Sequence, residues 1–214
     1  MSRRISEDFT KLSAFLNEYS LAEYSANQSQ LDECKAMHKK LYGLMIFVAE
    51  YIQQHGNAII STYLDETASD LLLSLFSWVQ GMYKPAKLEL RCAIENFLKA
   101  IISVSAPKIV EEKIIFEVFE SAKSDKHISN DFGQPRGDLL RNDYVVLCRT
   151  VHSATEEINS TSALNLLPNY NSEMAKELVT IYLRTVESIL GILYFNYPSV
   201  VDKMHPENKA DFLG

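Results

Sequence analysis

Apolar residues recur every three or four positions along almost the whole chain, and this spacing limits the fold more than any other feature. Such a period places apolar side chains on one face of an α-helix, whereas a half-buried strand needs strict alternation. No stretch alternates cleanly enough to require a strand, and only 7 Gly and 6 Pro interrupt 214 residues. The sequence therefore predicts an all-α fold, a single-domain bundle of about six or seven helices.

The expected helices follow these apolar stripes. Gly56 and Gly81 are placed to end the second and third helices, because glycine readily adopts the left-handed conformation that closes a helix. The apolar stripes of these two helices include Met45, Ile52 and Leu72, which are therefore expected in the core. The helices are expected to cover residues 5–19, 28–55, 61–80, 85–103, 107–122, 138–152 and 172–196.

One domain is expected to span residues 1–214, since no repeat or linker divides the chain. Its core is expected over about residues 28–196, with a loop at 124–137 and a frayed tail at 201–214. The chain shows no apolar signal segment, and its longest apolar runs are too short and interrupted to span a bilayer. We therefore expect a cytoplasmic protein that has no membrane partner.

Charge and motifs exclude several functions. A formal net charge of -7 argues mildly against nucleic acid as a partner, although a local basic patch could still bind it. The three cysteines (Cys34, Cys92 and Cys148) form no CxxC pair, and the five histidines show neither HxxxH nor HExxH spacing. No Gly-rich phosphate loop and no GxSxG turn is present. We expect no cofactor and no bound metal.

Arg91 and Glu95 are the first candidate site residues. On a helical wheel they fall among Leu88, Leu98 and Ile102, so we expect them on a second packed side of their helix. They are one helical turn apart and can pair directly. Burying charged groups is costly unless they are paired or used. The pair can be an ordinary surface ion pair, a structural pair that fixes helix register, or part of a catalytic site.

Arg149 and His152 are the second candidate pair, at the end of the helix expected over residues 138–152. Their spacing places both on one flank of that helix. A histidine can change protonation near neutral pH and serve as general acid or base, and a neighbouring arginine can hold a phosphate. The alternative is that His152 forms a hydrogen bond across a helix junction and Arg149 is a surface charge.

The two candidate helices together resemble a known group of proteins. They are similar, over about residues 78–155, to the HEPN-like superfamily of bacterial all-helical proteins. That superfamily consists of small helical bundles, many of them dimeric, and many are metal-independent ribonucleases of toxin–antitoxin and phage-defence systems. The matching residues are Leu90, Arg91, Ile94 and Glu95, then Tyr144, Cys148, Val151 and His152.

The resemblance departs from the superfamily at its catalytic signature, an arginine separated from a histidine by about four to six residues. Here two residues separate Arg149 from His152, and ten separate Arg141 from His152. Superfamily members without the signature are often binding or regulatory modules.

Three functions therefore stay open. In a defence or toxin ribonuclease, His152 would be the general acid and base, Arg149 and Arg91 would hold the scissile phosphate, and Glu95 would orient them. In a non-catalytic interaction or regulatory module, the polar pairs would specify packing and the ligand would be a partner protein. Both imply a homodimer. The third function is a sensor that holds an anionic or nucleotide ligand between the helices at 85–103 and 138–152.

Overall fold

The computed structural model of the protein describes residues 2–18, 28–56, 59–151 and 171–213. Within these residues it contains nine α-helices, one 3-10 helix and no strand, which confirms the predicted all-α fold. The elements are α1 (Arg3–Glu18), α2 (Gln28–His55), α3 (Ile59–Val79), α4 (Tyr83–Ser103), η2 (Pro107–Glu111), α5 (Ile115–Ser124), α6 (Gly133–Val151), α7 (Ser172–Asn196), α8 (Pro198–Asp202) and α9 (Pro206–Leu213).

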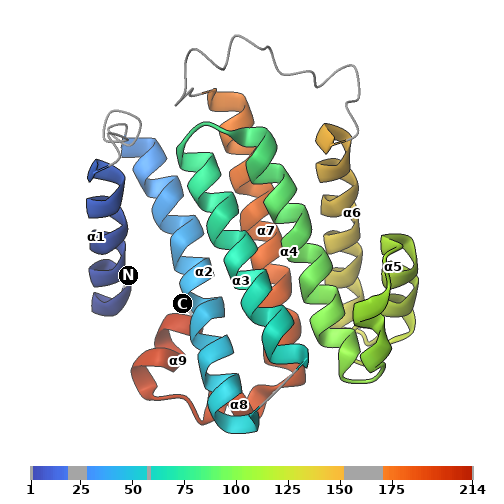
Figure 1. Ribbon diagram of the computed structural model, residues 1–214. Coiled ribbons are helices and arrows are strands. Elements are labelled where there is room, and N and C mark those ends of the chain that lie inside the picture. Colours follow the sequence, from blue (N-terminus) through green and yellow to red (C-terminus); the bar gives the residue numbers. More distant parts are fainter. Residues whose placement is uncertain (1, 19–27, 57–58, 152–170, 214) are drawn as a thin grey trace.

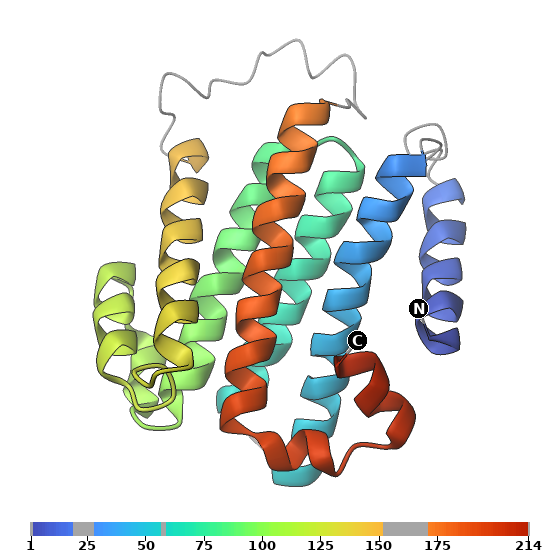
Figure 2. The same ribbon diagram turned by 180° about the vertical axis from the view of Figure 1, so that it is seen from behind.

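Four long helices (α2, α3, α4 and α7) lie side by side and form the centre of the bundle (Figures 1 and 2). α1 flanks α2 on one side, and α6 with the short α5 flanks α4 on the other. Two of the most deeply buried aromatic rings of the core, Trp78 and Tyr182, have hydrogen-bond partners for their polar groups. The Trp78 indole N–H donates to the Ala175 carbonyl at 3.1 Å, and the Tyr182 hydroxyl donates to the Leu71 carbonyl at 3.2 Å. Their polar atoms are thus satisfied inside the apolar interior.

The helix boundaries agree closely with the expected ones in the first half of the bundle. α2 spans the expected residues, and Gly56 and Gly81 follow α2 and α3 with φ angles of 65° and 69°. A residue with a Cβ would be strained in this left-handed conformation, which explains why glycine stands at both positions. α7 also has the expected bounds, and the side chain of Asn171 caps it by accepting from the Glu173 and Met174 N–H groups.

The expected single helix over residues 107–122 is wrong. The structure divides this stretch into η2 and α5, and Glu112 and Ile114 between them have extended backbones. Ile114, which lies within the helix expected there, is 60% exposed. The position of Ile114 fits the three-to-four-residue spacing of a helix, but its side chain does not pack against a neighbouring helix.

The segment expected to be a loop at 124–137 is also shorter than expected, because α6 begins at Gly133 rather than at Asp138. The side chain of Asn130 accepts the Gly133 N–H at 2.8 Å and so caps the helix five residues early. Pro135 fits in the first turn, where a missing N–H costs no hydrogen bond.

The C-terminal residues form helices instead of the expected frayed tail. α8 and α9 turn back beside α2 (Figure 2) and bury Val200, Val201 and Phe212. Phe212 packs 5.7 Å from the ring of Phe47 in α2. This apolar contact, which joins residues far apart in the sequence, holds the tail against the bundle.

Within the described part of the chain, α7 alone has the length and hydropathy of a membrane span. Of its most apolar stretch, 61% is buried inside the bundle. A helix at the centre of a bundle is apolar on most sides for the same reason.

Candidate functional site

Arg91 and Glu95 of α4 meet Tyr144 of α6 in one closed cluster. Arg91 Nε donates to Glu95 Oε1 at 3.0 Å, and the Tyr144 hydroxyl donates to the same oxygen at 2.8 Å. The guanidinium carbon of Arg91 lies 5.4 Å from the centre of the Tyr144 ring, within the range of a cation–π contact. The Arg91–Glu95–Tyr144 cluster therefore joins α4 to α6. This agrees with the expectation that Arg91 and Glu95 lie on a second packed side of their helix.

The cluster is satisfied from within. The side chains of Arg91 and Glu95 are 22% and 26% exposed. Burial, followed by the hydrogen bond to Glu95, raises the pKa of Tyr144, so its hydroxyl stays protonated and remains a donor. Burial lowers the pKa of Arg91, but the hydrogen bond to Glu95 and nearby groups outweigh it and raise the pKa. Arg91 thus stays a cation. Because Glu95 balances its positive charge, Arg91 would attract a phosphate less strongly than an unpaired arginine would.

The structure does not bring Arg149, the described member of the second candidate pair, into this cluster. Arg149 is exposed near the end of α6. Its flank is the solvent side of the helix, since Val145 one turn earlier is 51% exposed. No contact between the described residues links Arg149 to Arg91 or Glu95. His152 lies outside the described residues, so its predicted role stays a prediction.

Sequence reasoning missed the contact of Tyr144 with Glu95, although Tyr144 is among the residues that carry the family resemblance. The signal for it is the cross-helix contact, which one helical wheel cannot reveal. Asp70 of α3 was missed as well. Asn96 Nδ2 of α4 donates to Asp70 Oδ2 at 2.8 Å, and burial raises the pKa of Asp70 to about 6 against that hydrogen bond. Glu89 and Glu95 are among the carboxylates that raise it further, so this side of α4 is acidic.

Replacing Asp70 with asparagine is expected to change how stability depends on pH. A carboxyl whose pKa is about 6 in the folded chain, against an unfolded value of about 3.9, favours the folded state less as pH rises between those values. Wild-type stability should therefore fall by about 1 kcal/mol from pH 4 to 7, a figure reduced for the partial exposure of Asp70.

Urea midpoints measured at pH 4 and at pH 7 test this expectation. In D70N the fall should shrink, because asparagine does not titrate and its amide can still accept from Asn96. Glu117→Gln, at an exposed position of α5 and not among the carboxylates that act on Asp70, is the control and should keep the wild-type difference. A D70N profile that matches wild type would show that Asp70 has an ordinary pKa.

Other arrangements typical of catalysis are not supported by the geometry. Both Asp125 Oδ1, at 2.8 Å, and Ser105 Oγ, at 3.5 Å, lie against the same ring nitrogen of His127, Nδ1. A nucleophilic relay needs the acid and the hydroxyl on opposite ring nitrogens. Burial raises the pKa of Cys34 to about 12 and that of Cys92 to about 11, so neither thiol is an activated nucleophile. No group of metal-ligating side chains gathers among the described residues.

The face of α2 and α3 carries a second candidate site, where the structure corrects the expected core. Met45, Ile52 and Leu72, which we expected to be buried, are 47%, 44% and 44% exposed. They line a hollow of about 450 Å³ between the two helices, together with Ala68 and Asp65. We call this hollow the α2/α3 groove. Met45, Ile52 and Leu72 therefore form an apolar stripe on the surface, beside the stripe that faces the core.

Comparisons of this chain with protein families, with curated proteins and with solved structures find no match. The resemblance to the HEPN-like superfamily therefore rests on the sequence motif alone.

Proposed function

We propose that the protein is a non-catalytic helical interaction module that binds a segment of a partner protein in the α2/α3 groove. The observation that carries this proposal is the gathering of Met45, Ile52 and Leu72 around one hollow. Single exposed apolar residues are ordinary on protein surfaces. Several that line a common concave surface are typical of a site that binds another protein.

Charge supports one kind of occupant. α3 contains no Lys or Arg, and neither does α2 from Leu41 to His55. Asp65 lines the groove, and Glu66 is exposed next to it. An amphipathic helix with an apolar stripe flanked by Lys or Arg complements such a surface in shape and in charge. A second copy of the same face would instead place like charges opposite one another, so we propose a basic helix from another protein.

The polar clusters fit this proposal better than they fit catalysis. In the Arg91–Glu95–Tyr144 cluster the arginine is paired with a carboxylate, and Asp70 and Glu89 add negative charge nearby. A phosphate would be repelled by these carboxylates unless other cations compensated for them. The cluster therefore serves to fix the packing of α4 against α6, which is the structural interpretation of the pair.

Two designed peptides test the groove. Both carry leucine at positions i, i+3, i+4 and i+7, one with lysine and the other with glutamate on the flanks. We expect fluorescence anisotropy to show binding of the lysine peptide at least about tenfold tighter than that of the glutamate peptide. Leu72→Asp should weaken the lysine peptide about tenfold or more, whereas Val145→Asp, on the exposed side of α6, should leave it unchanged.

Three outcomes would count against the groove proposal. Equal affinity for the two peptides would remove the charge argument, and an unaltered affinity of L72D would place the contact elsewhere. Sedimentation that shows a dimer dissociated by L72D would identify the occupant as a second copy, which would overturn the proposal of a basic partner helix.

The second candidate is a metal-independent ribonuclease of a bacterial defence or toxin system. The observation that favours it is the exposed Arg149, which stands three residues before His152 and can reach a phosphate. Under the non-catalytic proposal, wild type and His152→Ala should leave cellular RNA equally intact and growth equally unaffected. If wild type degrades RNA and arrests growth while H152A does neither, the ribonuclease function replaces the interaction module.

A further inference from the structure

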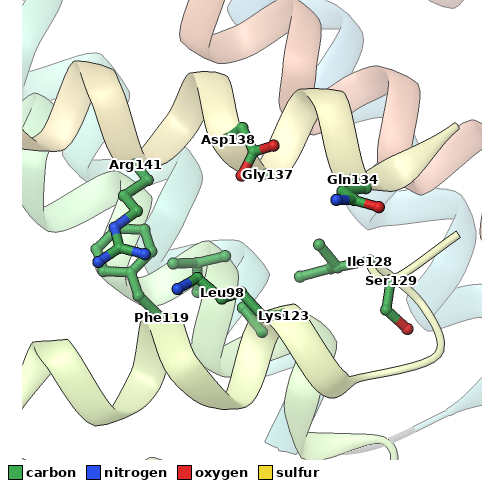
Figure 3. Close-up of a pocket in the computed structure, with 10 residues that line it drawn as sticks. Leu98, Phe119, Lys123, Ile128, Ser129, Gln134, Gly137, Asp138 and Arg141 are labelled. Carbon is green, nitrogen blue, oxygen red and sulfur yellow. The ribbon is translucent and has the colours of Figure 1, made fainter. Parts of the chain in front are cut away.

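A separate pocket lies between α5 and α6 (Figure 3), two helices on the far side of α4 from α2 and α3 (Figure 1). Its volume is about 200 Å³, and Leu98 of α4 is among the residues that line it. Neither the Arg91–Glu95–Tyr144 cluster nor the groove contributes a lining residue to it. The pocket is therefore independent of the function proposed above.

The floor of the pocket is apolar and rigidly built. Leu98, Phe119, Ala122 and Ile128 line it, and each is buried. The absence of a side chain at Gly137 makes room for Ile128, since a Cβ there would lie 2.8 Å from Ile128 Cγ2. Ile128 is thus held against α6 and forms a fixed wall. A cavity with such a lining favours an apolar group over water.

The rim of the pocket is polar and locally cationic. Lys123 Nζ and Arg141 Nη1 lie 2.7 and 3.4 Å from the same oxygen of Glu120. The hydrogen bond from Lys123 is the main cause that lowers the pKa of Glu120, so this carboxyl stays ionised. On this side of the rim two cations therefore share one carboxylate, although Asp138 on the other side brings the summed charge of these four groups to zero. Arg141 carries five N–H donors, and among the described residues Glu120 is the carboxylate it contacts.

Asp138 sets where an anion can lie on this rim. It is the acidic residue of the pocket lining. In Figure 3 the side chain of Arg141 extends toward Phe119, away from Asp138. An anionic group would therefore be repelled from the Asp138 side and attracted to the side where Arg141 and Lys123 lie.

We propose that this pocket binds a small aromatic carboxylate, with its ring on the floor formed by Leu98, Phe119 and Ile128 and its carboxylate toward Arg141 and Lys123. The size follows from the volume, because a cavity of about 150 Å³ accommodates benzene and a somewhat larger one accommodates a substituted or fused ring. The negative charge of the ligand follows from the local distribution, because Arg141 and Lys123 outnumber Glu120 on the side of the rim away from Asp138. A guanidinium also matches the geometry of a carboxylate, to which it can donate two parallel hydrogen bonds.

Naphthalene-2-carboxylate is the probe, and naphthalene-2-carboxamide is its neutral counterpart. Calorimetric titration of the full chain is expected to show that the carboxylate binds at least about tenfold tighter than the amide. Arg141→Gln should abolish that preference and leave the affinity of the amide unchanged. Ala122→Leu should weaken both probes, because its side chain fills the floor. Lys84→Gln, which removes an exposed cation at the start of α4, should have no effect.

Several results would overturn the inference. Equal affinity for the two probes in wild type, or a preference that survives in R141Q and also in Lys123→Gln, would remove the cationic rim as its cause. Unaltered binding by A122L would show that the probe lies outside the pocket. The absence of carboxylate binding at millimolar concentration would exclude the site. None of these results bears on the peptide experiments, which test a different face.

Discussion

Replacing Arg184 with methionine is expected to lower the free energy of unfolding by about 3–5 kcal/mol. Asp143 of α6 is fully buried, and Arg184 of α7 is its cationic partner. Arg184 Nε lies 3.0 and 3.1 Å from the two carboxylate oxygens, Nη2 also donates, and Thr185 Oγ1 donates at 3.2 Å. Methionine keeps the length of the side chain but leaves the buried carboxylate, among the described residues, with only the hydroxyl of Thr185 as a donor. The loss is large because an unpaired buried charge keeps its desolvation cost.

Chemical denaturation at neutral pH measures this loss. Lys11→Met, at an exposed position of α1, is the control and should alter stability by no more than about 0.5 kcal/mol. If R184M is as stable as that control, the ion pair contributes nothing to the attachment of α6 to α7. Replacing both Asp143 and Arg184 with apolar residues should recover part of the loss, because no buried charge then remains.

The helical periodicity of the sequence predicted most helices well. Where apolar spacing coincided with a glycine or a cap, as at α2 and Gly56, the boundary was correct. The errors arose where one local signal outweighed another. The side chain of Asn130 caps α6 before Asp138 is reached, and the exposed Ile114 imitates a core position. A wheel assigns residues to faces, but it does not say which face meets a neighbouring helix.

The same limit explains what the sequence predicted of the sites. The pairing of Arg91 with Glu95 was predictable because both residues are on one helix a single turn apart. Their contact with Tyr144 joins residues 49 positions apart and depends on how α6 packs on α4. The exposure of Met45 and Ile52 likewise depends on the groove that α3 leaves open beside α2. Tertiary packing, rather than residue type, therefore decides both the contact of Tyr144 with Glu95 and the exposure of Met45 and Ile52.

The second large effect is expected from Glu177 of α7, whose carboxylate lies 3.0 Å from the Nζ of Lys87 in α4. The two members of this pair differ in burial, since the side chain of Lys87 is 4% exposed and that of Glu177 is 45% exposed. Glu177→Ala should therefore lower the free energy of unfolding by about 2–4 kcal/mol, because it leaves a buried ammonium group without its acceptor.

Lys87→Met should have only a small effect on stability, although it breaks the same ion pair. Methionine fills a similar volume, and the carboxylate that loses its partner can be solvated at the surface, so stability should stay within about 1 kcal/mol of wild type. In the K87M background, Glu177→Ala should then cost little, because no buried cation remains to be stranded. Urea denaturation of wild type, the two single variants and the double variant measures this coupling. Equal losses in the two single variants would contradict it and would mean that Lys87 reaches water once Glu177 is removed. The asymmetry follows from burial alone: the penalty falls on whichever charge stays behind without access to solvent.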